Sequence, residues 1–268
     1  MPLPDDHGGY GERLLGQSRP GEADRLAALA DACDPATVAV LDTLPLPPDS
    51  RCLDVGAGLG TIARRLLARC PQGRVTAADL DTRFLDGTAD PRLDVRRLDV
   101  RTADLPAGSF DLIHARNLLA HLPDRERVLT RLVGWLAPGG FLYVEDVSFF
   151  PVDSSPHTAY RTLMRAGLAT VGRTVGSDLD GWARSYPAPL LARGLTDVGL
   201  RVRCAPLTAD SPDGVLWRRS LEQVRDAIVD GGAATAREVE EGLACFADPA
   251  FTDLAPALVA AWGRAPRS

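Results

Sequence analysis

A short apolar strand that leads into three alternating glycines is the feature that most constrains the fold of this chain. The stretch RCLDVGAGLGTIARRLL occupies residues 51–67, with glycines at positions 56, 58 and 60. Because glycine adopts positive φ without steric cost, these positions predict a tight turn between a strand over 51–55 and a following helix. Because glycine has no Cβ, a ligand can approach the backbone of such a turn closely. We therefore expect a binding loop at the carboxyl end of the first strand.

Strands and helices alternate along the next hundred residues. Further strands are expected at 73–80, 93–100, 109–115 and 141–147, and helices at 20–45, after residue 60 and after residue 123. This alternation indicates an α/β fold with a mostly parallel sheet covered by helices on both faces. The segments 148–190 and 209–246 are long for plain connections, so we expect a mostly helical lid there. The predicted regions are an N-terminal helical cap (1–45), a cofactor-binding core (46–147), and the rest of the sheet with the inserted substrate lid (148–268).

The composition excludes several kinds of partner and chemistry. All 30 basic residues are arginine, so a G-K-[ST] phosphate loop, a pyridoxal Schiff base and a Tyr-x-x-x-Lys dehydrogenase pair are excluded. The net charge of −6 disfavours nucleic acid, and the longest apolar runs are too short to span a bilayer. The five cysteines include no C-x-x-C pair, and the histidines show no metal-ligand spacing. We expect a cytoplasmic protein, monomeric or homodimeric, without a secretory signal or a metal.

The spacing of the glycines and two acidic residues indicates which ligand the loop binds. A dinucleotide loop has the pattern G-x-G-x-x-G, but Thr61 stands at its third glycine position. Asp79 ends the second expected strand, 23 residues after Gly56, at the distance from which a carboxylate reaches ribose hydroxyls. Asp99 ends the third, where its carboxylate and the Val100 N–H suit an adenine edge. The pattern favours an adenosine ligand that lacks a pyrophosphate.

Five motifs in order resemble those of the class I S-adenosylmethionine-dependent methyltransferases. They are LDVGAGLG, VTAADLD, RRLDV, FDLIHARNLLAHLPD and LAPGGFLYVED, and they cover roughly residues 50–147. The likeness is nearest to the small-molecule branch related to the ubiquinone and menaquinone methyltransferases. It implies a Rossmann-like sheet of seven strands, the last one inserted antiparallel. It also implies S-adenosylmethionine as cofactor and S-adenosylhomocysteine as product.

The resemblance further implies the residues that contact the cofactor. The glycines would wrap its amino-acid part, Asp79 would bind ribose, and Leu80 would lie beside the adenine. Asp54 would meet the amino group or the loop itself. The full set is Asp54, Gly56, Ala57, Gly58, Gly60, Asp79, Leu80, Asp99, Val100, Ala115 and Arg116.

Candidate catalytic residues lie just beyond the fourth and fifth strands. His121, in LLAHLPD, is the candidate general base, and Asp146 is the carboxylate that would orient its ring. A capping or loop role for His121 stays open. His114, within the fourth strand, is expected to pack or to contact the cofactor. This arrangement favours O-methylation over N- or C-methylation.

Aromatic side chains are the candidates for an apolar substrate pocket. They are Tyr10, Phe149, Tyr160, Trp182 and Trp217, with core packing as the alternative. The expected activity is methylation of a small, partly apolar molecule of the bacterial secondary-metabolite class. Three alternatives stay open: a cofactor-binding enzyme of this fold with a non-methylating reaction such as cyclisation, a nicotinamide oxidoreductase, and a non-catalytic partner-binding subunit.

Overall fold

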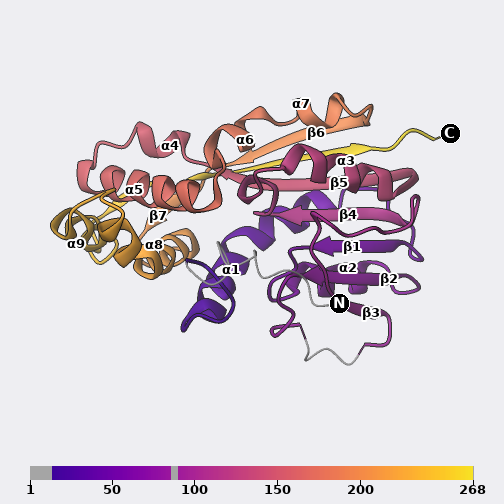
Figure 1. The fold of residues 1–268 in the computed structure, drawn as a ribbon, viewed down its shortest axis with the longest axis horizontal. Helices are drawn as coiled ribbons and strands as arrows, with labels where there is room; N and C mark the ends of the chain where they lie inside the picture. The colour runs from indigo at the N-terminus through magenta and orange to yellow at the C-terminus, as the bar shows by residue number, and fades with distance from the viewer. Residues whose placement is uncertain (1–13, 86–89, 268) are drawn as a thin grey trace. The chain divides into compact units, whose positions relative to one another are not determined.

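The computed structural model describes residues 14–85 and 90–267, and its largest element is a seven-stranded sheet (Figure 1). The strand order is β3-β2-β1-β4-β5-β9-β6. The strands are β1 (Arg51–Val55), β2 (Arg74–Asp79), β3 (Leu93–Arg97), β4 (Phe110–Arg116), β5 (Leu136–Ser148), β6 (Thr196–Arg203) and β9 (Ala257–Arg264). Strands β3, β2, β1, β4 and β5 pair in parallel, whereas β6 and β9 are antiparallel. The expected insertion of the last strand, between β5 and β6, is confirmed.

Helices cover both faces of this sheet because its crossovers run in opposite directions. Helix α2 (Thr61–Arg69) joins β1 to β2, whereas α3 (Arg125–Trp135) joins β4 to β5 on the other side of β1. Right-handed crossovers in opposite directions place their helices on opposite faces. Leu66 of α2 and Leu132 of α3 are fully buried. Helices therefore cover both faces of the sheet, as expected.

Two compact units divide the chain. The first comprises residues up to 32, 148–179 and 204–257; the second comprises 33–147, 180–203 and 258 onward. Helix α1 (Glu22–Leu41) contributes residues to both. Each unit is discontinuous in sequence, and the three-region division at residues 45 and 147 stays a prediction. In the described ranges we find no helix with the length and apolarity that crossing a bilayer requires.

Residues 148–179 and 204–257, together with those up to 32, form a mostly helical unit with its own core. Its elements are α4 (Phe150–Asp153), α5 (Thr158–Val175), α8 (Pro212–Asp230), α9 (Ala236–Cys245), β7 (Pro206–Thr208) and β8 (Thr252–Leu254). Thr235 begins α9 with a capping box, in which its side chain and that of Glu238 each accept from the other's backbone N–H. Tyr160 lies against Phe246 and Phe251, with ring centroids 5.8 and 5.4 Å apart. The expected helical content of the lid segments is present here, while their role as a lid stays a prediction.

The segment 180–203 belongs to the sheet unit. It contains most of α6 (Leu179–Ser185), all of α7 (Ala188–Leu191) and the edge strand β6. A short 3-10 turn, η1 (Leu119–His121), follows β4 in the same unit. Both segments position side chains that matter for the site.

Candidate cofactor and active site

The glycine turn is bonded to the end of β2. Gly56, Gly58 and Gly60 have φ values of 70°, 53° and 71°, the left-handed region that glycine adopts without strain. The N–H groups of Gly56 and Ala57 both donate to the Ala78 carbonyl, over 2.8 and 3.2 Å. The backbone after β1 thus has a left-handed conformation that is strained for residues other than glycine. This explains the alternating glycines on local grounds.

The turn lies where ligands bind in sheets of this kind. Strand β1 has β2 on one side and β4 on the other, so the chain reverses its direction through the sheet between β1 and β4. The crevice at the carboxyl ends of such a strand pair is the usual ligand site. Val55 is aligned with Ala115 of β4, and Arg116 ends that strand. The structure therefore brings Ala115 and Arg116 beside the glycine turn.

Asp79 ends β2 and faces the same turn. One of its oxygens accepts from the Gly58 N–H over 2.9 Å and the other from the Asp81 N–H over 3.2 Å. Burial raises the pKa of this carboxyl. Leu80, the next residue, is 51% exposed although it is apolar. A carboxylate and an exposed apolar side chain beside a glycine turn suit a ribose and a flat base.

The third strand ends earlier than expected. Strand β3 stops at Arg97, because Asp99 begins a turn in which its carbonyl accepts from the N–H groups of Thr102 and Ala103. The Asp99 carboxylate forms an ion pair with Arg101, at 2.8 Å from Nη2 to Oδ2 and 3.0 Å from Nε to Oδ1. Val100 is buried. An adenine contact by Asp99 stays a prediction, and Arg101 would share that carboxylate.

A buried row of charged side chains lies next to the turn. His114 Nδ1 is 2.7 Å from Asp54 Oδ1, and Nε2 is 3.2 Å from Glu145 Oε1. The two carboxylates raise the pKa of His114 to about 9 against the opposing effect of its burial. Asp54 is thus engaged by His114, and a contact with a cofactor amino group stays a prediction. The pairing of His114 with Glu145 was not predicted from the sequence. The signal that could have predicted it is the presence of polar residues within otherwise apolar strands.

Arg116 extends this row to α1. Its guanidinium donates to Asp34 Oδ1 over 2.8 Å and to Thr37 Oγ1 over 3.0 Å. Thr37 in turn donates to Glu145 Oε1 over 2.7 Å. Arg116 therefore connects the end of β4 to the helix, and the cofactor contact that the family resemblance implies for it stays a prediction.

Asp146, the expected partner of the candidate base, accepts hydrogen bonds from two other groups. Both oxygens of Asp146 are held by groups other than the His121 ring: the Tyr186 hydroxyl donates over 2.7 Å and the Ala120 N–H over 3.3 Å. Burial raises the pKa of Asp146 to about 7. His121, half-buried, ends η1, and Ala120 precedes it. Asp146 therefore holds the turn that carries His121, and a direct pair between these side chains stays a prediction.

Comparison with known proteins supplies the family. Residues 53–142 match the methyltransferase domain family. An uncharacterized methyltransferase of Mycobacterium tuberculosis is 40% identical over 111 residues, which are 40% of this chain and 55% of the relative. The chain thus spans about half the length of that relative. A trans-aconitate 2-methyltransferase of Deinococcus radiodurans is 33% identical over 204 residues, 72% of this chain and 77% of the relative. The chain belongs to the class I S-adenosylmethionine-dependent methyltransferases.

Solved structures of this family show the same fold. The phosphoethanolamine N-methyltransferase 2 of Haemonchus contortus, in complex with S-adenosylhomocysteine, has a TM-score of 0.53 at 16% identity, over 91% of this chain and 52% of that one. The [4+2]-cyclase SpnF has a TM-score of 0.52 at 18% identity, over 97% of this chain and 89% of that one. At these identities the likeness is one of fold alone. The ubiquinone and menaquinone branch stays a prediction.

The residues of this methyltransferase fit the family's cofactor. A Cβ on Gly56 would come no closer than 3.5 Å to its nearest neighbour, the Leu118 side chain, so the space beside this glycine is open to a ligand. A Cβ on Gly60 would instead come within 2.8 Å of the Leu85 side chain. S-adenosylmethionine is the cofactor of this family and S-adenosylhomocysteine is its product. The nicotinamide oxidoreductase alternative is excluded by the family. Among residues 14–85 and 90–267, no group of three or more His, Cys, Asp or Glu side chains could hold a metal ion.

The aromatic candidates are largely engaged in packing. Tyr160 is fully buried and donates its hydroxyl to the Leu254 carbonyl over 3.1 Å. Phe149 packs edge-to-face on Trp217 at 5.2 Å, and buried Trp182 donates to the Tyr186 hydroxyl over 2.9 Å. Tyr10 lies outside the described residues. Tyr160 and Trp182 are thus packed in this structure, and substrate contacts by Phe149, Tyr160, Trp182 and Trp217 stay a prediction.

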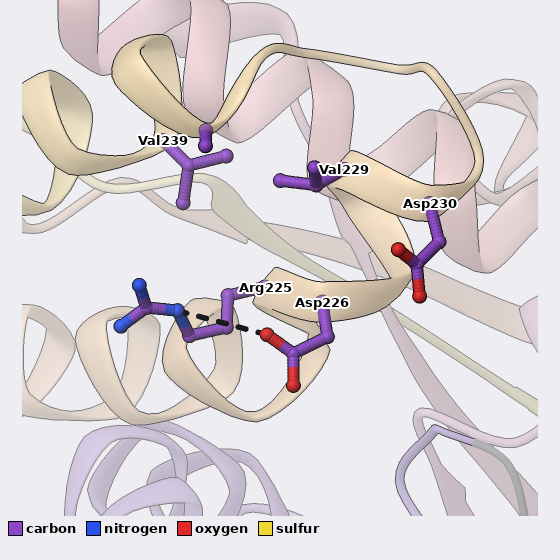
Figure 2. Close-up of a pocket in the computed structure, with 6 residues that line it drawn as sticks. Arg225, Asp226, Val229, Asp230 and Val239 are labelled. Carbon is purple, nitrogen blue, oxygen red and sulfur yellow. Dashed lines mark ion pairs between the residues drawn. The ribbon is translucent and has the colours of Figure 1, made fainter.

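A separate hollow of about 300 Å³ lies in the helical unit (Figure 2). It is lined by Arg225, Asp226, Val229, Asp230, Ala236 and Val239. The side chains of Arg225 and Asp226 form a loose ion pair there, at 3.9 Å. None of the residues expected to bind cofactor or substrate lines this hollow, so it is no part of the candidate active site.

Proposed function

We propose that this methyltransferase transfers a methyl group from S-adenosylmethionine to an oxygen atom of a small, partly apolar molecule. The observation that carries the proposal is the left-handed glycine turn held by Asp79 beside the end of β4. The relative from Deinococcus radiodurans is named for methylating trans-aconitate, a small molecule. This supports a small acceptor, and a bacterial secondary metabolite remains our preferred class.

S-adenosylmethionine supplies, when bound, a methyl group already activated on a sulfonium. Much of the remaining task is alignment, which the protein provides by holding both partners in place. Gly56, Gly58 and Asp79 would hold the cofactor. A hydroxyl acceptor must also lose a proton, for which His121 at the end of η1 is the candidate base. Asp146 would position it through the Ala120 N–H.

The chain also has properties that suit a cytoplasmic enzyme. None of its five cysteines, all within the described residues, forms a disulfide, and Cys33, Cys52 and Cys70 are buried. Reduced, buried thiols are typical of the cytoplasm. The net charge of −6 disfavours nucleic acid as a partner. We infer a cytoplasmic monomer or homodimer that acts on small molecules.

Calorimetry and turnover together test this function. S-adenosylhomocysteine should bind the purified protein, while NAD should not. With a panel of small hydroxyl- and carboxyl-bearing acceptors, S-adenosylmethionine should be converted to S-adenosylhomocysteine and the acceptor should gain 14 mass units per methyl group, about one CH₂. Binding of NAD alone would overturn the proposal. Cofactor binding with an acceptor that is isomerised and not methylated would favour the cyclase alternative.

A further inference from the structure

Three neighbouring strands place three ionisable side chains in one buried row. In the register of β1 and β4, Asp54 is aligned with His114; in that of β4 and β5, His114 is aligned with Tyr143. Glu145 follows Tyr143 by two residues, so its side chain points to the same face. Asp54 and His114 are 2% exposed and Glu145 is 0% exposed. The parallel sheet itself therefore brings the imidazole between two carboxylates.

With both carboxylates ionised, this arrangement requires a protonated ring. An ionised carboxylate can only accept, and a neutral imidazole can donate from only one nitrogen. Nδ1 and Nε2 each face a carboxylate oxygen, at 2.7 and 3.2 Å. An imidazolium donates to both, whereas a neutral ring would set a lone pair against one carboxylate. The raised pKa of His114 has the same cause.

We call Asp54, His114 and Glu145 the histidine clamp. The charged groups around this clamp determine its net charge. From α1, Thr37 donates to Glu145, and Asp34 pairs with Arg116 of β4. On β5, the Tyr143 ring lies 5.5 Å from the imidazole. With Asp54 on β1, the row holds three acids and two cations when His114 is protonated. Loss of the His114 proton would leave Asp54 and Glu145 buried beside each other without the cation that separates them.

The clamp is joined to the backbone that forms the cofactor turn. Asp54 precedes Gly56 by two residues. The Glu145 carbonyl accepts from the N–H of Asn117, which follows β4 with a φ of 50°. Because His114 of β4 contacts both Asp54 of β1 and Glu145 of β5, it links the ends of these three strands. Few rearrangements are open to a fully buried ion group of this kind.

We propose that His114 is a positioning residue for the cofactor, and that its proton, held between Asp54 and Glu145, keeps the glycine turn in the form that binds S-adenosylmethionine. Asp54 then acts on the loop and not on the cofactor amino group. The inference rests on the proposed function, because it needs a cofactor at the turn. The inference goes beyond the proposed function because it makes cofactor affinity depend on His114, a buried side chain that does not contact the cofactor.

The test measures the affinity for S-adenosylhomocysteine by calorimetry at pH 7 and pH 10. The proteins are the wild type, His114→Gln and His157→Gln, an exposed histidine of the helical unit as matched control. At pH 7, His114→Gln should bind about tenfold or more weakly, within the usual range of coupling between sites, and the control should bind normally. Between pH 7 and 10 the wild type should lose more affinity than His114→Gln. The ligand's own ammonium titrates in both proteins, so their difference isolates His114.

The possible results separate the two proposals. If the wild type does not bind S-adenosylhomocysteine at pH 7, the proposed function fails. If it binds but folded His114→Gln matches it, or both lose affinity equally with pH, the positioning role is overturned. Should His114→Gln not fold, Glu145→Gln serves instead. Removing one of the two carboxylates should move the pH at which affinity falls to a lower value, and an unmoved profile would overturn the role.

Discussion

The hydroxyl of Tyr186 donates to Asp146 Oδ2 over 2.7 Å, and both side chains are buried. Tyr186→Phe should cost about 1–3 kcal/mol of stability, because a buried carboxylate oxygen loses its donor. It should also raise the pKa of Asp146 further above about 7, since that hydrogen bond favours the ionised form. Chemical denaturation and carbon-13 NMR of the carboxyl measure the two effects.

Tyr160→Phe is the matched control for Tyr186→Phe. It also removes a buried tyrosine hydroxyl hydrogen bond, but its acceptor is the Leu254 carbonyl in the helical unit. A comparable loss of stability without a change in the Asp146 pKa is expected. If both variants shift that pKa alike, the shift reflects general loosening and not the Tyr186 contact.

Gly56→Ala should separate ligand access from backbone strain. Gly56 and Gly108 share a φ of 70°, and a Cβ at either position meets no protein atom closer than 3.5 Å. Each alanine variant should therefore lose about 1–2 kcal/mol of stability through its left-handed φ. Only Gly56→Ala should also lose affinity for S-adenosylhomocysteine in calorimetry. Equal affinities for the two variants would remove Gly56 from the cofactor site.

His121→Ala tests the candidate base. With a hydroxyl acceptor, turnover should fall by a factor of about 10²–10⁴, the usual contribution of a general base, while S-adenosylhomocysteine affinity changes little. With a carboxylate acceptor, which needs no deprotonation at neutral pH, turnover should fall far less. Initial rates with both acceptor types measure this. Unchanged turnover on a hydroxyl acceptor would exclude His121 as the base.

Alkaline pH should destabilise the sheet unit through His114. Its pKa in the folded protein is about 9, above the ordinary value of 6.5. The stabilisation from its proton is therefore complete below about pH 6.5 and is lost as pH rises through about 9, amounting to on the order of 3 kcal/mol. Urea unfolding at pH 6.5 and 9.5 should show the loss, and His114→Gln should lack it. A wild-type stability that stays level over this range would refute it.

The local features of the fold could be predicted because they depend on neighbouring residues. The glycines at 56, 58 and 60 do have left-handed φ, and β1 spans Arg51–Val55 as expected. The third strand was predicted too long, because Asp99 accepts hydrogen bonds from the turn after it and ends the strand pattern earlier. Apolar alternation signals that a strand exists more reliably than it signals where the strand ends.

The sequence by itself determined the α/β class, the left-handed glycine turn after β1 and the family to which the chain belongs, since each depends on short motifs. Only the tertiary structure decided the partners of the buried polar groups. His114 meets Asp54 across 60 residues of sequence, and Tyr186 meets Asp146 across 40. Such pairs depend on strand register and chain return, which no local pattern encodes. The physical reason is that a buried charged group is costly unless it is paired, and the packing of the chain decides which partner lies close enough to pair with it.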